Sequence, residues 1–216
     1  MSTNQHRLIE RIRDRLGGTQ APELPPVLRT PARSQGADTF CAALESVSGQ
    51  VHRVTCSDDG LLVLRGLIAD REWSSIACSD SEFLQGWCER LGSICRPDSA
   101  ANPIPREKLL KMDAGLCTAQ IGIADTGSLA LCSEAERHRL VSLVPPSSII
   151  VLFERDLVPD FATALQRFEE NGLPTTLSFI TGPSRTGDIE LTLTVGVHGP
   201  ASVDVILIRE ADGASA

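Results

Sequence analysis

The sequence predicts an α/β protein: a three-layer sandwich in which helices cover both faces of a mostly parallel sheet. Short apolar, β-prone runs alternate along the chain with amphipathic helical segments, a pattern typical of parallel sheets. The length of 216 residues suits a single α/β domain. A hydrophobic content of 42% and a charged content of 22% are ordinary for a soluble globular protein.

The N-terminal segment is predicted to be separate from this domain. Residues 6–16 place four apolar side chains at helical spacing, and Gly17 with the next glycine ends the pattern. Residues 21–36 contain four prolines and form an extended linker. We therefore divide the chain into an N-terminal helix with a Pro-rich linker, 1–36, and an α/β domain, 37–216.

The first half of the domain is predicted to be mainly helical, because apolar residues recur at helical spacing. Phe83, Leu84, Trp87 and Leu91, for example, fall on one side of a helix. We expect helices near 37–47, 59–69, 81–91 and 106–112, and strands at 51–55 and 75–78.

From Leu116 onward the pattern is mostly that of strands. Asp160 to Glu169 is the exception, an amphipathic helix ended by Asn171-Gly172. We expect strands at 117–124, 128–131, 148–153, 175–180 and 203–208. Residues 189–197 are ambiguous: apolar residues alternate there as in a strand, whereas the hydroxyls before them could cap a helix. We favour the helix.

The stretch from Thr181 to Pro200 combines glycines, hydroxyls, a cation and several titratable groups. Glycines allow backbone N–H groups to converge on one point, and a guanidinium beside them favours a carboxylate or phosphate ligand. Alternatively, the hydroxyls act only as helix caps and the arginine as a surface ion-pair partner. The candidate ligand-binding residues here are Gly182, Ser184, Arg185, Thr186 and Gly199.

Asp188, Glu190 and His198 in the same stretch are candidate proton-transfer residues. Each has a structural alternative. Acidic residues are favoured in a first helical turn by the helix dipole, and a histidine in a turn is often a structural hydrogen-bonding group.

A second candidate loop consists of Asp125, Thr126, Gly127 and Ser128, between two predicted strands. This composition suits a tight turn, and it also resembles glycine-hydroxyl loops that hold substrates. A charged cluster follows, and we expect most of it to be solvated, with Glu134 or Arg137 able to reach over a cleft. Its members are Glu134, Glu136, Arg137, His138 and Arg139.

Several function classes are disfavoured. The net charge of −8 argues against a nucleic-acid partner. No segment approaches the ~18 apolar residues of a membrane span, and with no apolar signal core we expect a cytoplasmic protein. The seven cysteines contain no CxxC pair, and Cys88 and Cys95, the closest two, are seven apart. That spacing predicts no metal site, so we expect no cofactor bound by this chain.

The motifs GPSRTGDIE, GVHGP and ADTGSLAL together resemble the lactate-utilisation protein C family, whose shared unit is the LUD domain. The resemblance covers about Leu116 to Ile208, with Gly187 where the family is expected to carry alanine. It implies the fold of glucosamine-phosphate isomerase, ribose-phosphate isomerase and CoA-transferases (NagB/RpiA/CoA-transferase-like). In such sheets ligands bind beyond the carboxyl ends of the strands, where the two candidate loops could converge.

The resemblance also implies a function: the oxidation of L-lactate to pyruvate by a complex whose partner subunits carry iron–sulfur clusters. In this interpretation the chain binds a small carboxylate or phosphate ligand, or an anionic group of a partner, with Arg185 as the anchor. Two alternatives stay open. One is a stand-alone isomerase or transferase acting on a phosphorylated or CoA-type substrate, and the other is a non-catalytic assembly module that docks through its N-terminal helix.

Overall fold

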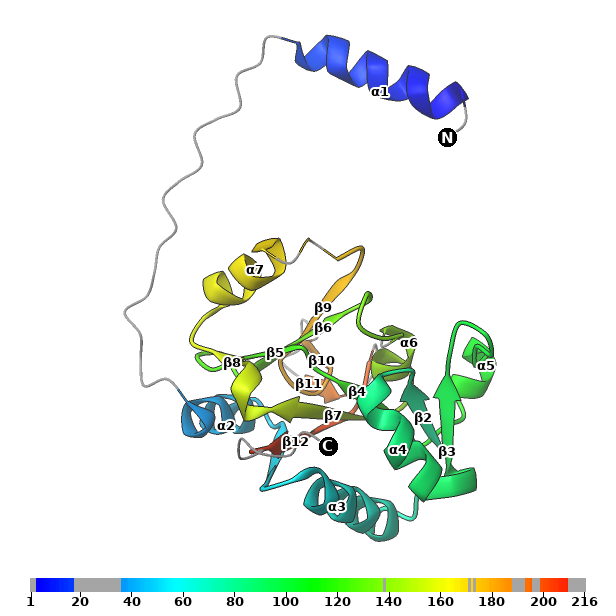
Figure 1. The fold of residues 1–216 in the computed structure, drawn as a ribbon, viewed down its shortest axis with the longest axis vertical. Coiled ribbons are helices and arrows are strands. Elements are labelled where there is room, and N and C mark those ends of the chain that lie inside the picture. The colour runs from blue at the N-terminus through cyan, green and yellow to red at the C-terminus, as the bar shows by residue number, and fades with distance from the viewer. Residues whose placement is uncertain are drawn as a thin grey trace.

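The central element of the structure, a computed structural model, is a six-stranded sheet in which every neighbouring pair is parallel (Figure 1). The strand order is β1-β12-β7-β4-β2-β3. The structure describes residues 3–17, 36–137, 139–170, 172, 174–187, 193–195 and 199–209. The strands are β1 (Gln50–Val54), β2 (Ile76–Ser79), β3 (Cys95–Asp98), β4 (Ala114–Thr118), β7 (Ser147–Phe153) and β12 (Ser202–Ile208). The predicted α/β class with a parallel sheet is confirmed.

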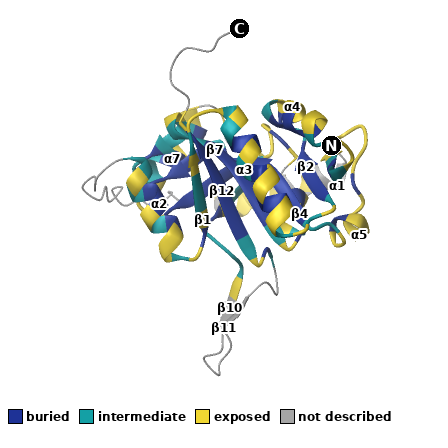
Figure 2. Cartoon of the chain, turned by 90° about the horizontal axis from the view of Figure 1, so that it is seen from below, coloured by how far each residue is buried: buried dark blue, intermediate teal, exposed yellow. Residues whose placement is uncertain are grey.

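One face of this sheet is covered by α3 (Ser57–Asp70) and α4 (Glu82–Leu91). Their apolar side chains, such as Leu64 and Trp87, pack on alternate strand residues such as Leu116 and Ile206. The inner strands β12, β7, β4 and β2 are largely buried, while the outer sides of the helices are exposed (Figure 2). This face is an ordinary helix-on-sheet layer, as the period of the sequence predicted.

The opposite face is covered by α2 (Ala37–Ser46), α5 (Arg106–Leu109), α6 (Arg139–Leu143) and a second sheet. Phe40 and Leu44 of α2 are fully buried against this face. Helix α6 crosses β4 so closely that a Cβ on Gly115 would lie 1.8 Å from the carbonyl oxygen of Val141. Glycine is therefore required at that position for the two backbones to approach.

The second sheet has the order β8-β5-β6-β9, and two of its strands directly follow strands of the first sheet. Strand β5 (Ile121–Ile123) follows β4 after two residues, and β8 (Leu157–Val158) follows β7 through a 3₁₀ turn, Glu154–Asp156. β5 and β8 stay parallel to each other, as β4 and β7 are. Strands β6 (Ser128–Cys132) and β9 (Leu177–Ile180) complete the sheet, and α7 (Phe161–Glu170) packs on its outer face.

A short antiparallel pair, β10 (Arg185–Gly187) and β11 (Leu193–Val195), lies between β9 and β12. The helix that we favoured for 189–197 is therefore wrong at 193–195, and Arg185 begins a strand and not a helix. The alternation of apolar residues was the correct signal, because cross-strand pairing satisfies the backbone there. The remaining residues of that segment lie outside the described residues.

The single strand expected at 117–124 is wrong, because the chain there forms two strands in different sheets, β4 and β5. The other predicted elements agree with the structure within a few residues. The N-terminal helix is α1 (Thr3–Leu16), while most of the predicted linker lies outside the described residues. Strand β3, helix α6 and strand β8 were not predicted. Among the described residues, no helix is long and apolar enough to cross a membrane.

A buried ion pair joins the strands near their amino ends. Asp204 on β12 is fully buried and accepts hydrogen bonds from both terminal nitrogens of Arg71, at 2.7 and 2.8 Å. His52 Nε2 lies 3.1 Å from the same carboxylate. Burial alone would raise the pKa of Asp204, but the contacts with His52 and Arg71 hold it below its usual value.

Candidate functional site

The two loops that the sequence singled out contact each other. Ser128 Oγ lies 2.8 Å from Thr181 Oγ1 and accepts a hydrogen bond of 2.8 Å from Thr126 Oγ1. Asp125 is exposed, and its backbone N–H donates to the carbonyl of Pro159. The structure therefore brings together loops that are more than fifty residues apart in the sequence.

Both loops also pack on α2. Gly127 has a φ of +65°, and a Cβ there would lie 2.3 Å from the backbone nitrogen of Leu44. Gly182 has a φ of +134°, and a Cβ there would lie 3.1 Å from the carbonyl oxygen of Val47. These glycines are needed for close backbone approach and for positive φ.

The guanidinium of Arg185 lies at the C-terminal end of α2. It donates to the carbonyl oxygen of Val47 at 3.2 Å and to Ser48 Oγ. A cation at this end complements the helix dipole and satisfies a carbonyl without a helical partner. In this state Arg185 supports the helix that both loops contact, and its side chain is exposed.

The described residues near Ser184 and Gly199 lie at the amino ends of the main strands. The backbone N–H of Ser184 donates to the carbonyl of Pro200 at 2.8 Å, and that of Ala201 donates to Pro146, which precedes β7. Gly199 packs 3.2 Å from the Cβ of Ser184. The expectation that the two loops meet beyond the carboxyl ends of the parallel strands is therefore wrong for the Thr181–Pro200 stretch.

The structure describes the other predicted residues of this stretch only in part. Thr186 pairs with Thr194 in the β10–β11 ribbon, and nothing is described of its side chain. Asp188, Glu190 and His198 lie outside the described residues. Their proposed part in proton transfer stays a prediction.

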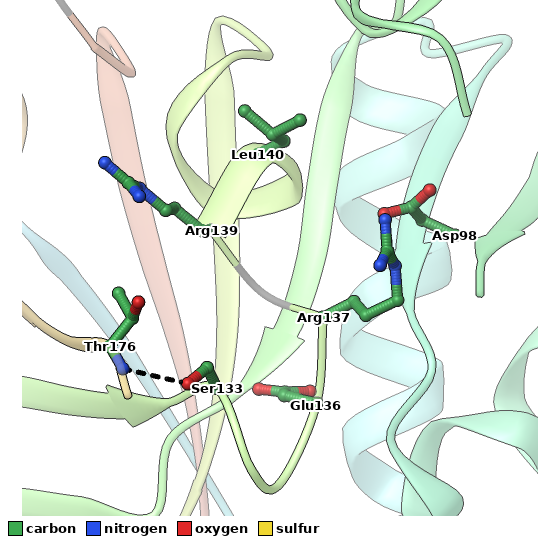
Figure 3. A pocket seen from close by; sticks show the side chains of 7 residues that line it. All are labelled: Asp98, Ser133, Glu136, Arg137, Arg139, Leu140 and Thr176. Carbon is green, nitrogen blue, oxygen red and sulfur yellow. Dashed lines mark hydrogen bonds and ion pairs between the residues drawn. The ribbon is translucent and has the colours of Figure 1, made fainter. Parts of the chain in front are cut away.

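A different cavity lies at the carboxyl ends of β2, β3 and β4. It encloses about 230 Å³. Its lining residues come from the end of β3, the loop that joins β6 to α6, the start of α6 and the segment before β9: Asp98, Ser133, Glu136, Arg137, Arg139, Leu140 and Thr176 (Figure 3). This is the edge at which parallel α/β sheets bind ligands.

Glu136 is the central residue of this cavity, and its side chain is only 3% exposed. Its carboxylate accepts the backbone N–H of Thr118, at 2.9 Å to Oε1 and 3.2 Å to Oε2. Ser79 Oγ donates to Oε2. Thr118 and Ser79 are the last residues of β4 and β2, so the ends of two parallel strands hold the carboxyl group in place.

Burial raises the pKa of Glu136 to about 7, although the hydrogen bonds from Ser79 and Thr118 oppose the shift. A carboxyl group with a pKa near neutrality is present in both protonation states at physiological pH, which suits a general acid or base. Combined with its position in a cavity, this makes Glu136 the strongest candidate for proton transfer among the described residues.

Two arginines also line this cavity. Arg137 reaches toward Asp98, with Nε 3.4 Å from the buried Oδ2, whereas Arg139 extends the other way (Figure 3). Asp98 also accepts the backbone N–H of Ile104 at 2.6 Å. Arg139 is exposed and forms no ion pair within the described part of the chain. The cavity therefore offers one guanidinium that a small anion can engage.

The loop that carries Glu136 is fixed at its start. The backbone N–H of Thr176 donates to Ser133 Oγ at 3.0 Å, and that of Thr175 donates to Glu134 at 2.7 Å. The hydrogen bonds that Glu134 accepts from Thr175 and from Ser133 Oγ lower its pKa to about 2, so this exposed carboxylate is ionised and ties the segment before β9 to the loop. In this structure Glu134 therefore has a structural role.

The sequence placed Glu136 in a charged cluster that we expected to be largely solvated. Within that cluster we singled out Glu134 and Arg137, and not Glu136, as able to reach over a cleft. No local signal distinguished it. Its burial results from the ends of β2 and β4, which are adjacent only in the folded sheet.

Comparison with known proteins completes the description of the site. The profile of the LUD domain matches residues 37–208. The chain belongs to the LUD domain family. The resemblance to lactate-utilisation protein C is confirmed: a protein of that name from an Exiguobacterium species is 27% identical over 96% of this chain and 97% of its own length.

Other relatives match over shorter regions. An uncharacterised protein of Neisseria meningitidis is 41% identical over 54% of this chain and 56% of that protein. In several of these alignments the chain spans about half the length of the relative. A crystal structure of a DUF162 family protein from Deinococcus radiodurans superposes with a TM-score of 0.58 at 20% identity, covering 79% of this chain and 94% of that one. It supports the fold alone.

Proposed function

We propose that this LUD domain protein is a component of an L-lactate utilisation system and that the Glu136 cavity binds the small carboxylate substrate or product. The main supporting observation is a buried carboxyl group with a pKa near neutrality at the carboxyl ends of parallel strands, in a cavity that the exposed Arg139 also lines. Family membership supports the pathway, since relatives bear the name lactate utilization protein C.

The cavity suits a ligand of this size and charge. At about 230 Å³ it lies below the ~300–1,000 Å³ of sites for drug-sized molecules. In this proposal Arg139 pairs with the ligand carboxylate, and Glu136 accepts the proton that leaves the hydroxyl of lactate. Arg137 stays paired with Asp98 and holds the rim of the cavity.

Oxidation of lactate to pyruvate releases two electrons and two protons. One proton leaves the hydroxyl and is accepted by Glu136, and the other leaves Cα. We propose that the partner subunits take up the Cα proton and the two electrons, with their iron–sulfur clusters as the electron acceptor. This chain then contributes binding and proton transfer, and the complete reaction requires the complex.

Isothermal calorimetry on the full chain with lactate, pyruvate and inorganic phosphate tests the site. Arg139→Ala removes one charge-assisted contact, worth roughly 1.5–3 kcal/mol, so the Kd of the carboxylates should rise about 10- to 100-fold. Arg65→Ala, on the outer side of α3, is the matched control and should leave the Kd unchanged. Equal affinities in the wild-type protein and Arg139→Ala would contradict the assignment.

The same titration separates this cavity from the loop that the sequence favoured. If Arg185→Ala abolishes carboxylate binding and Arg139→Ala does not, the ligand site lies at the Thr181–Pro200 stretch. Turnover of a sugar phosphate or CoA thioester by the isolated chain would instead favour a stand-alone isomerase or transferase.

A further inference from the structure

Three cysteines that are far apart in the sequence meet in the folded protein. Cys78 lies on β2, Cys88 on α4 and Cys95 on β3. All three are buried, and their sulfur atoms lie within 4.8 Å of one another. The sequence spacing gave no sign of this group, because each sulfur comes from a different element of the fold.

The geometry of the three sulfurs is close to that of a mononuclear thiolate site. Zn²⁺ binds cysteine sulfur at about 2.3 Å, and a tetrahedron with that radius places neighbouring sulfurs about 3.8 Å apart. The sulfur atoms therefore have to approach one another by at most about 1 Å to share one ion. Strands β2 and β3 are hydrogen-bonded neighbours, so two of the ligands stand on a rigid support.

A cavity reaches this cluster from the surface. It encloses about 520 Å³ and is lined by Cys88 and Cys95 together with polar residues. The polar lining residues include Ser79, Asp80 and Glu89. A metal ion has a path to the sulfurs, and a ligand bound from the cavity can complete its coordination.

The three cysteines also contact one another directly. The thiol of Cys88 shares hydrogen bonds with those of Cys78 and Cys95. Two other buried cysteines, Cys41 and Cys117, belong to the core cluster on the other face of the sheet and lie apart from this group.

We propose that Cys78, Cys88 and Cys95 bind a single Zn²⁺ ion, with the fourth coordination position open to the cavity beside Asp80 and Glu89. Three thiolates select a soft or borderline ion over Mg²⁺ or Ca²⁺. Zinc sites that bind exogenous ligands have three protein ligands and leave the fourth position open to exchange. Structural zinc sites, by contrast, have four protein ligands. This site is separate from the Glu136 cavity and does not depend on the proposed role in lactate utilisation.

Titration of the reduced, metal-free full chain with Co²⁺ tests the proposal, because thiolate-bound tetrahedral Co²⁺ absorbs in the near-ultraviolet and visible. One equivalent should produce these bands, and one equivalent of Zn²⁺ should remove them. Cys88→Ala and Cys95→Ala should abolish the bands. Cys41→Ala, a buried cysteine outside the cluster, is the matched control and should keep them.

X-ray absorption of the Zn²⁺-loaded wild-type protein needs no variant. Three sulfur neighbours at about 2.3 Å are expected. Binding only through nitrogen and oxygen, bands that persist in both Cys88→Ala and Cys95→Ala, or a native disulfide between two of the three cysteines would each overturn the proposal.

Discussion

The buried carboxyl group of Glu136 should make the stability of this protein fall as the pH rises toward neutrality. Its pKa is raised from an ordinary 4.5 to about 7 in the folded state. Below pH 4.5 the group is protonated in both states. Between pH 4.5 and about 7 the unfolded chain releases the proton while the folded protein retains it, so the free energy of unfolding decreases across this window.

The magnitude follows from the two pKa values. They differ by roughly 2.5 pH units, and at about 1.36 kcal/mol for each unit the contribution is ~3 kcal/mol. Glu136→Gln removes the titration. The unfolding free energy of the variant minus that of the wild type should therefore increase by ~3 kcal/mol from pH 4.5 to about pH 8.

Urea unfolding at a series of pH values, followed by circular dichroism, measures this difference. Lost hydrogen bonds in Glu136→Gln add an offset that is the same at every pH, so the slope isolates the titration. Glu107→Gln, an exposed residue on α5, is the control and should show no comparable slope. A difference that stays flat between pH 4.5 and about 8 would refute the raised pKa.

Two further predictions concern stability. Arg71→Ala leaves the fully buried Asp204 carboxylate without its bidentate partner, and the free energy of unfolding should fall by roughly 3–5 kcal/mol in denaturant melts; a loss typical of an exposed ion pair, below ~1 kcal/mol, would contradict this. Gly127→Ala places a side chain at a positive φ and against the backbone of α2, so the free energy of unfolding should fall by at least ~1–3 kcal/mol. Gly66→Ala, in open space within α3, should raise it by ~0.5–1 kcal/mol. Equal effects of the two changes would contradict the argument from close backbone approach.

The sequence predicted most of the fold, because hydrophobic periodicity is a local property. The elements it missed lack such a pattern. Strand β3 reads Cys95-Arg-Pro-Asp98, and its Pro97 argues against a strand in general. Proline is tolerated here because β3 lies at the edge of the sheet, where one side has no strand to pair with. Helix α6 is only five residues long and is held by its crossing of Gly115.

The site was harder to predict because its chemistry arises between elements. The contact between Ser128 and Thr181 agrees with the expectation that the two candidate loops converge, which came from the family resemblance and not from either loop alone. The position of Arg185 against Val47 could not be expected, since nothing in its own segment indicates the end of α2. Glu136 and the three cysteines acquire their environments from β2, β3 and β4, whose adjacency is a property of sheet order alone.

The continuation of β4 into β5 and of β7 into β8 limits how the molecule can move. At these two connections the chain leaves one pair of parallel strands and enters the next pair directly. Rotation of one sheet against the other would have to bend the chain at both connections at once, residues 119–120 and 154–156, so we expect little hinge bending between the sheets. Entry and release at the Glu136 cavity are then expected to depend on side-chain rearrangement at its rim, and ligand binding should leave the hydrodynamic radius of the protein unchanged.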